Sequence, residues 1–253
     1  MTRVIAVINQ KGGSGKTTTT VNLGAYLSEF GKRTLIIDLD PQANTTIHFG
    51  FKPHEIDKSV YDTMMDDSPF SKTIKSTEIN NLFIAPANIN LSGVEIELSG
   101  IVGREMVLKD ATAEILKKFD FILIDCPPSL SLLTINALTV AEEIIIPVQT
   151  EFFALEGMGK LFNTVEIVKK RLNRNLKISG ILPTMFDVRT NLSREVIEKI
   201  HEYFKDEVYK TKIRKNIKLA EASSHGKPIM LYDPSSAGAE DYESFSKEVL
   251  YGD

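Results

Sequence analysis

Short apolar runs recur along the 253-residue chain, and each is bounded by turn-forming or polar residues. The runs do not alternate with polar positions, which is typical of strands buried on both faces of a parallel sheet. They predict six strands, at residues 4–8, 34–37, 82–85, 121–124, 144–148 and 178–182.

Helical patterns lie between these runs, at residues 17–30, 130–141, 157–172 and 191–204. The alternation of strand and helix predicts an α/β fold, with a doubly wound, mostly parallel sheet flanked by helices. The polar segment 51–76 is expected to form short helices beside the sheet. No repeat, low-complexity tract or linker interrupts the chain, so we expect residues 1–253 to form one domain.

Composition removes several classes of protein. Apolar residues make up 42% and charged residues 25% of the chain, as in an ordinary globular protein. The single cysteine, Cys126, excludes an intramolecular disulfide and a four-cysteine metal site, and the four histidines lack zinc-like spacing. The first apolar run is too short for a signal peptide, and none reaches the roughly 18 residues of a membrane span.

Charge is unevenly distributed along the chain. The net charge is −4, yet residues 160–218 carry 15 Lys and Arg against 7 Asp and Glu. A basic region on an acidic body is typical of proteins that bind nucleic acid, and equally of solvated helical surfaces. Charge alone leaves both interpretations open.

A glycine-rich segment follows the first strand and precedes the first helix. In "VINQKGGSGKTTTT", Gly12, Gly13 and Gly15 would let backbone N–H groups close around a phosphate, at the positive end of the following helix. Lys16 is expected to contact the β- and γ-phosphates, and the Thr17 hydroxyl to bind Mg²⁺. The general phosphate-loop pattern has glycine where Gln10 stands, so the loop departs from the common form.

Carboxylates follow two other predicted strands. "TLIIDLDPQ" places Asp38 and Asp40 after one strand, and "FDFILIDCPPS" places Asp125 after another. Ligands of open parallel sheets bind at the carboxyl ends of the strands, where the loop also lies. Asp125 has the form of a Walker B acid, which holds Mg²⁺ through its water shell. The chemistry predicted is phosphoryl transfer to water.

The loop sequence "KGGSGKTT" resembles the deviant Walker A motif, K-G-G-x-G-K-[ST]-[ST], of the ParA/MinD ATPases, which are P-loop NTPases of the SIMIBI type. The later segments "DLDPQ", "DCPPSL", "PVQTEFFALEG", "TMFDVRTNLS", "SHGKPI" and "YDPSSAGAEDY" resemble successive blocks of the chromosomal ParA, or Soj, branch. The resemblance extends from about residue 4 to residue 249. It implies a partitioning ATPase that uses ATP and Mg²⁺.

The resemblance also implies roles for individual residues. Lys11 would reach the phosphates of a partner subunit, Asp40 would orient the attacking water, and Asp38 and Asp125 would lie near the metal with Thr17. Gly12 would permit the close approach of two subunits in an ATP-bound homodimer. The implied nucleotide-binding residues are Lys11, Gly12, Gly13, Ser14, Gly15, Lys16, Thr17, Thr18, Thr184 and Met185.

The family binds double-stranded DNA without sequence preference and responds to a ParB-type centromere-binding protein. Its basic DNA-facing positions resemble Arg189, Lys215 and Lys218, with Arg214 as an added charge. Relatives often read "IPRNVRLSEAPSHGKPI" where this chain reads "IRKNIKLAEASSHGKPI", so two arginines have become lysines. Lysine keeps the charge but loses the bidentate fork. The resemblance further implies a cytoplasmic, nucleoid-associated protein of the short ParA type, without an N-terminal helix-turn-helix extension.

Other functions on the same fold remain open. A MinD-like ATPase would act on a membrane, but the C-terminal "EDYESFSKEVLYGD" is acidic rather than basic. An iron protein of the nitrogenase type would need more cysteines than one. A ligase such as dethiobiotin synthetase fits the loop only, and a positioning ATPase with a protein cargo is a further alternative.

Overall fold

The computed structural model describes residues 2–66, 68–151 and 157–252. Within these residues, seven strands form one sheet in the order β3-β4-β2-β5-β1-β6-β7, and only β3 runs antiparallel to its neighbour. The strands are β1 (Arg3–Val7), β2 (Thr34–Asp38), β3 (Lys75–Ser76), β4 (Leu82–Ala85), β5 (Phe121–Asp125), β6 (Glu143–Gln149) and β7 (Lys177–Thr184). The predicted doubly wound, mostly parallel α/β sheet is confirmed.

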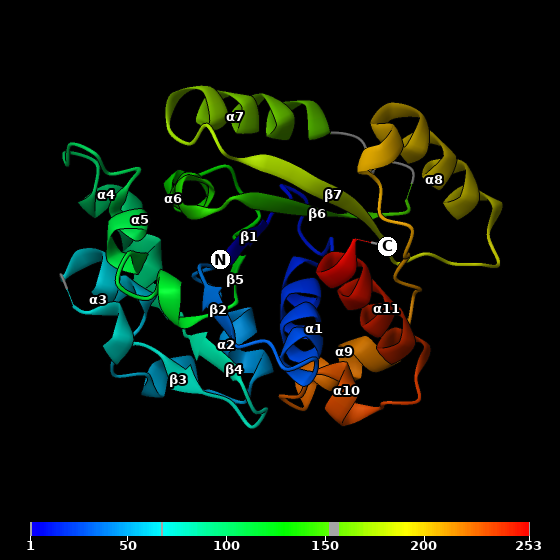
Figure 1. Ribbon diagram of the computed structural model, residues 1–253, viewed down its shortest axis with the longest axis horizontal. Helices are drawn as coiled ribbons and strands as arrows, with labels where there is room; N and C mark the ends of the chain where they lie inside the picture. Colours follow the sequence, from blue (N-terminus) through cyan, green and yellow to red (C-terminus); the bar gives the residue numbers. More distant parts are fainter. Residues whose placement is uncertain (1, 67, 152–156, 253) are drawn as a thin grey trace.

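Helices cover both faces of this sheet (Figure 1). The longer ones are α1 (Lys16–Glu29), α6 (Leu132–Val140), α7 (Met158–Arg171), α8 (Asn191–Phe204), α9 (Ile217–Ser224) and α11 (Ala237–Tyr251). The shorter ones are α2 (Asn44–His48), α3 (Val60–Met65), α4 (Val94–Glu97), α5 (Val107–Thr112) and α10 (Ile229–Tyr232). Short 3₁₀ helices lie at Pro53–Glu55, Phe70–Lys72, Ile89–Gly93, Leu116–Lys118 and Lys205–Glu207.

The strands are buried on both faces, as their unbroken apolar sequences predict. In β1, Ile5 and Val7 belong to a core shared with α1, α9, α10 and α11. Val4 and Ala6 point into the other core, which α3, α4, α5, α6, α7 and α8 complete. Figure 1 shows α1 and α11 side by side on the first face. The molecule therefore has three layers, with the sheet in the middle.

Helix α1 packs on the sheet through a glycine, Gly24. A Cβ atom at Gly24 would lie 2.6 Å from Cδ1 of Ile36 in β2. The close contact fixes the helix over the central strands, with its first turn at their carboxyl ends. This edge also gathers Asp38 and Asp125, which are register partners in β2 and β5.

Candidate functional site

The phosphate loop connects β1 to α1, as the sequence predicts. Asn9 shapes its start: the side-chain oxygen accepts from the backbone N–H of Lys11 at 2.9 Å, and Nδ2 donates to the Pro147 carbonyl at 2.7 Å. Gly13 and Gly15 adopt φ angles of 73° and 92°, in the left-handed region that favours glycine. The backbone conformation therefore explains two of the three glycines.

The loop presents unpaired N–H donors. Among the described residues, the backbone N–H groups of Gly12 to Thr18 find no protein acceptor. They lie at the N-terminus of a 14-residue helix, where the helix dipole favours an anion. This arrangement fits a phosphate chain, which would accept from several N–H groups at once.

Lys16 supplies the charge beside these donors. The residue is only 7% exposed, and its Nζ donates to the Lys11 carbonyl at 3.3 Å, across the loop. Burial lowers the pKa of the Lys16 ammonium, while the nearby Asp125 carboxylate opposes that shift. A phosphate is a natural partner for an ammonium group that has lost most of its contact with water.

Two fully buried carboxylates lie next to the loop. Oδ2 of Asp125 accepts from the hydroxyls of Thr17 and Thr45, each at 2.7 Å. Oδ2 of Asp38 accepts from the backbone N–H of Thr46 at 2.8 Å and from its hydroxyl at 2.7 Å. Burial raises the pKa of both carboxyls above the usual range, and the Asp125 charge raises that of Asp38 further.

Asp40 lies closer to solvent than these two carboxylates. It is 6% exposed and lines the pocket, and its Oδ1 accepts from the Gln42 backbone N–H at 2.9 Å. Hydroxyl and carboxylate oxygens are the ligands that Mg²⁺ prefers. The described residues contain no cluster of three or more His, Cys, Asp or Glu that could hold a metal by itself. The donor set therefore fits a metal that also takes ligands from a bound phosphate.

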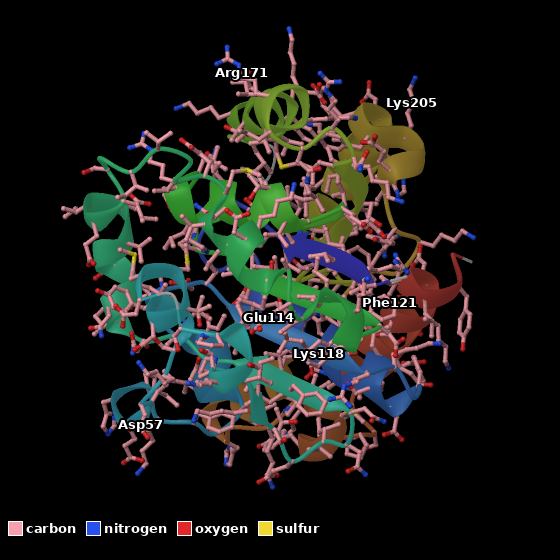
Figure 2. All side chains as sticks on the ribbon, turned by 60° about the vertical axis from the view of Figure 1, so that its left-hand side comes forward. Asp57, Glu114, Lys118, Phe121, Arg171 and Lys205 are labelled. Atoms are coloured by element: carbon pink, nitrogen blue, oxygen red, sulfur yellow. The ribbon has the colours of Figure 1, made fainter. Side chains whose placement is uncertain are left out.

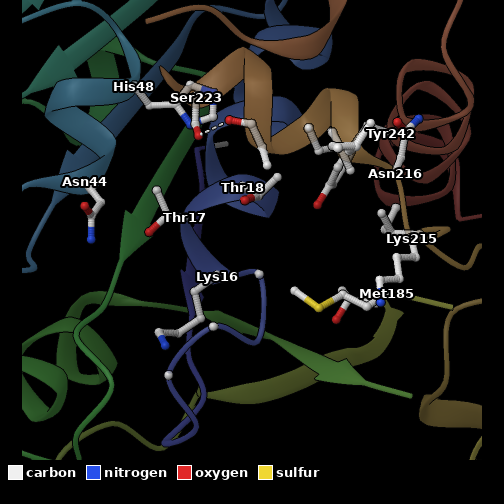
Figure 3. A pocket seen from close by; sticks show the side chains of 18 of the residues that line it. Lys16, Thr17, Thr18, Asn44, His48, Met185, Lys215, Asn216, Ser223 and Tyr242 are labelled. Carbon is white, nitrogen blue, oxygen red and sulfur yellow. Dashed lines mark hydrogen bonds between the residues drawn. The ribbon is translucent and has the colours of Figure 1, made fainter. Parts of the chain in front are cut away.

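A pocket of about 1060 Å³ opens from the loop toward α2, α9 and α11 (Figure 3). In this view Thr18 lies between two groups of side chains. Asn44, His48 and Ser223 are on one side, and Met185, Lys215, Asn216 and Tyr242 are on the other. The sequence-predicted residues that line the pocket are Gly12, Gly13, Gly15, Lys16, Thr17, Thr18, Asp40, Thr184, Met185, Arg189, Arg214 and Lys215.

Five sequence-predicted residues do not line this pocket: Lys11, Ser14, Asp38, Asp125 and Lys218. Asp38, Asp125 and Ser14 are buried behind the surface of the loop. Lys11 is not among the lining residues and forms an ion pair with Glu151 at 3.2 Å. Residues 152–156 of the block "PVQTEFFALEG" lie outside the described residues.

Most of the predicted DNA-binding side chains already have anionic partners. Arg189 pairs with Asp187 at 2.8 Å, and Lys218 pairs with Glu221 at 2.8 Å. Arg214 contacts both Glu240 and Asp241 of α11. Of these four residues, Lys215 alone makes no ion pair with a described residue, and its side chain is exposed.

The excess of basic residues in 160–218 is not gathered on one face. Figure 2 shows Arg171, at the end of α7, and Lys205, after α8, extending outward from the molecule. Arg189 and Lys215 instead line the pocket. The basic region therefore divides between an outer helical surface and the mouth of the site.

Sequence reasoning did not single out Thr45, Thr46 and Gln149. The two threonines hold the buried carboxylates, and Gln149 donates from Nε2 to the Gly13 carbonyl at 2.7 Å. The only signal for the threonines was their place just after "DLDPQ", and for Gln149 its place at a predicted strand end. Neither position is unusual enough to identify a function from the sequence.

Known proteins resemble this chain in sequence over most or all of its length. A family model described as an AAA domain matches residues 2–178. The chain is 53% identical over 249 residues to the sporulation initiation inhibitor protein Soj of Bacillus subtilis (strain 168), covering 98% of each protein. It is 43% identical over 251 residues to the chromosome partitioning protein ParA of Myxococcus xanthus (strain DK1622), covering 99% of this chain and 89% of that one.

A solved structure is similar over nearly the whole fold. Cobyrinic acid a,c-diamide synthase from Mycobacterium smegmatis, with bound ATP analogue and magnesium, matches with a TM-score of 0.90 and 38% sequence identity. The match covers 99% of this chain and 94% of that one. Its ligands are those expected for a loop and carboxylates of this kind.

Proposed function

This chain belongs to the ParA/Soj family of partitioning ATPases, and we propose that it uses Mg-ATP to switch between a state that holds DNA and a state that releases it. The predicted family is confirmed by 53% identity to Soj over 98% of both proteins. One observation carries the proposal: the phosphate loop and the basic residues Arg189 and Lys215 line the same pocket. A nucleotide bound at the loop can therefore affect the basic side chains that would bind DNA phosphates, and bound DNA can affect the nucleotide.

In the proposed reaction, the loop N–H groups and Lys16 hold the β- and γ-phosphates of ATP. The Thr17 hydroxyl, which here donates to Asp125 at 2.7 Å, would hold Mg²⁺, with Asp125 and Asp38 as the nearby carboxylates. When bound, Mg²⁺ supplies positive charge that offsets the charge on the phosphates. Asp40 orients the attacking water, which its position at the pocket surface supports. Positioning and charge neutralisation then supply most of the catalysis.

The proposed active form is a homodimer with ATP between the subunits. Gly12 supports this because nothing within the chain requires glycine there: its φ angle is not positive, and a Cβ would meet no atom within 4 Å. Lys11 supports it as well, because it lies outside its own pocket. A small residue at Gly12 and a lysine outside its own pocket, paired among the described residues only with the exposed Glu151, are suited to a second subunit.

The proposed partners are non-specific double-stranded DNA and a ParB-type protein that stimulates hydrolysis. DNA backbone contacts need cations rather than base-reading side chains. Lys215 makes no ion pair with a described residue, whereas Arg189 and Lys218 would exchange Asp187 and Glu221 for DNA phosphates. Such a protein would work in the cytoplasm, on the nucleoid. Cargo type, chromosome or plasmid, follows from the partner rather than from this chain.

A MinD-like function on a membrane has less support. No helix in the described part of the chain is long and apolar enough to cross a bilayer. A peripheral ATPase would instead bind lipid through the apolar side of an amphipathic helix. The apolar side of α11, including Tyr242 and Phe245, packs in the core against the sheet and α1. That surface is therefore not available to bind lipid.

Amide-forming ligase chemistry is the second candidate, because the similar M. smegmatis structure carries a synthase name. Enzymes that draw ammonia from glutamine with a thiol need an accessible cysteine. The one cysteine here, Cys126, is 1% exposed, and burial raises the pKa of its thiol well above the ordinary value. We therefore favour the partitioning function.

The proposal is tested by ATP hydrolysis with random-sequence DNA and the cognate ParB-type protein. Wild-type turnover should rise when both are present. Asp40→Ala should abolish turnover but keep ATP-dependent dimers, whereas Gly12→Val should bind ATP as a monomer. Fast hydrolysis by Asp40→Ala would remove its role, and hydrolysis unaffected by DNA and partner would contradict the partitioning function.

A further inference from the structure

Two consecutive carbonyl groups of the phosphate loop are held from outside by side chains of neighbouring strands. Gln149, the last residue of β6, donates from Nε2 to the Gly13 carbonyl at 2.7 Å. Thr184, the last residue of β7, donates from Oγ1 to the Ser14 carbonyl at 2.9 Å. Both donors are buried, with exposures of 8% and 2%.

The geometry of the peptide bond means that these two contacts also orient the loop N–H groups. A trans peptide places its C=O and the following N–H on opposite sides of the bond. When the Gly13 and Ser14 carbonyls are held toward the strands, the N–H groups of Ser14 and Gly15 must face the other way. Neither N–H has an acceptor among the described residues. They are therefore available to a phosphate.

The chemistry around Gln149 fixes which end of its amide faces the loop. Nε2 lies 2.7 Å from the Gly13 carbonyl and 3.3 Å from Sδ of Met185, and neither of these atoms carries a hydrogen to donate. A reversed amide would place its oxygen against both. The observed orientation leaves Oε1 buried without a partner in the described structure. The Gln149 amide therefore donates to the loop while its own oxygen makes no hydrogen bond to a described residue.

We propose that Gln149 and Thr184 are positioning residues of the nucleotide site, which orient the Ser14 and Gly15 N–H groups and thereby set the loop's affinity for the phosphates of ATP. The inference rests on the nucleotide site of the proposed function and deepens it. Neither side chain acts on phosphate by itself in this scheme. Each acts through a loop carbonyl.

A purely structural role would have different consequences. Side chains that only join the loop to the sheet would, when removed, reduce stability and weaken all ligands alike. Positioning residues would weaken ligands in proportion to their contacts with the loop. ATP and pyrophosphate should therefore be affected, while adenosine, which lacks phosphates, should not.

The chain offers matched variants for this comparison. Thr184→Val keeps the shape and removes the donor, whereas Thr184→Ser keeps the donor. Gln149→Met keeps similar length and removes the amide without adding charge. Thr139→Val is the control, because Thr139 is also buried and donates to the carbonyls of Glu105 and Asn136 in another part of the fold.

Isothermal titration of the full chain with Mg-ATP, Mg-pyrophosphate and adenosine is the test. Thr184→Val and Gln149→Met should raise the Kd for ATP and pyrophosphate about tenfold or more, with adenosine unchanged. Thr184→Ser should restore the Kd to within about twofold of wild type, since a hydrogen bond is kept. Thr139→Val should bind like wild type.

Wild-type affinity for ATP in both Thr184→Val and Gln149→Met would overturn this inference alone. An equal loss of adenosine affinity would also overturn it, in favour of a structural role. Absence of ATP binding by the wild-type protein would instead overturn the proposed function itself. A ¹H–¹⁵N spectrum without nucleotide gives a second readout: the Ser14 and Gly15 amide signals should shift in both variants, and unchanged signals would contradict the proposal.

Discussion

His48 ends α2 with its ring buried between that helix and the loop after α9. It is 2% exposed, and its Nε2 lies 3.1 Å from the Lys227 carbonyl. Burial lowers the pKa of the imidazole from 6.5 to about 4, although the Lys227 carbonyl opposes the shift. The ring is therefore neutral in the folded protein at pH values where it is charged in the unfolded chain.

This histidine should make folding sensitive to acid. Unfolding takes up a proton between pH 6.5 and about 4, so the contribution of His48 is complete above pH 6.5 and is lost as the pH falls through that window. The loss is about 3 kcal/mol from the size of the shift. Urea unfolding of wild type and His48→Gln at several pH values measures it, because Gln keeps a donor near Nε2 but does not titrate. Parallel pH curves for the two proteins would disprove this effect.

Lys215 and Arg214 are adjacent but differ in their freedom to bind DNA. Arg214 is held by Glu240 and Asp241, whereas Lys215 has no ion-pair partner among the described residues. Lys215→Ala should therefore weaken binding to DNA of any sequence and reduce the salt slope by about 1 to 2. Arg214→Ala should leave that slope nearly unchanged and lower the thermal midpoint instead. DNA-binding titrations at several salt concentrations measure the slope, and circular dichroism melts measure the thermal midpoint. A larger change in salt slope for Arg214→Ala than for Lys215→Ala would show that Arg214, not Lys215, binds DNA.

At the scale of elements, α2 links the buried carboxylates to α9. Thr45 and Thr46 hold Asp125 and Asp38 at one side of the helix. Beyond its other end, Gly50 meets Gly226 of the turn after α9, where a Cβ on Gly226 would lie 3.0 Å from the Gly50 Cα. The two turns touch through their backbones, so neither can move aside to accommodate a side chain.

Replacing Gly226 should test how tightly these elements are joined. Gly226 has a φ of 66°, so Gly226→Ala combines left-handed strain with a backbone clash and should cost at least about 2 kcal/mol. Gly31→Ala is the matched control, because Gly31 has a φ of 77° but its Cβ would meet no atom within 4 Å. It should cost about 1 kcal/mol. Chemical denaturation compares them, and equal losses would show that the contact carries no constraint.

The elements differ in how well the sequence predicts them. All six predicted strands and all four predicted helices are present, because continuous apolar runs and helical periodicity mark buried elements directly. Strand β3 is missed because its two residues, Lys75 and Ser76, are too few to show a period. No helices are predicted for residues 217–251, although α9, α10 and α11 form there. Segment 51–76 does form short helices, as expected.

The site shows the same division. Local motifs predict the positions of Lys16, Thr17 and Asp125, because each stands at a strand end or in the loop; their roles toward nucleotide and metal stay predictions. Thr45 and Gln149 acquire their contacts only when β2, β5, β1 and β6 lie in one order. Strand order depends on tertiary packing, which residue spacing does not encode.

At the scale of the whole molecule, the phosphate loop, the carboxylates and the mouth of the pocket lie at one edge of the sheet. Arg171 and Lys205 stand elsewhere, on the outer helices (Figure 2). DNA binding is therefore proposed for the surface that borders the nucleotide site. ATP occupancy should control it.

The most direct test of this claim measures how well the protein is retained on a surface coated with random-sequence double-stranded DNA. Retention is compared in Mg-ATP, in Mg-ADP and without nucleotide. The wild-type protein should be retained in Mg-ATP and released in Mg-ADP, with retention falling steeply between about 50 and 200 mM salt. Asp40→Ala should stay bound in ATP, and Lys16→Ala should not bind under any of these conditions. Equal retention in ATP and ADP, or no retention in ATP, would contradict an ATP-switched partitioning protein.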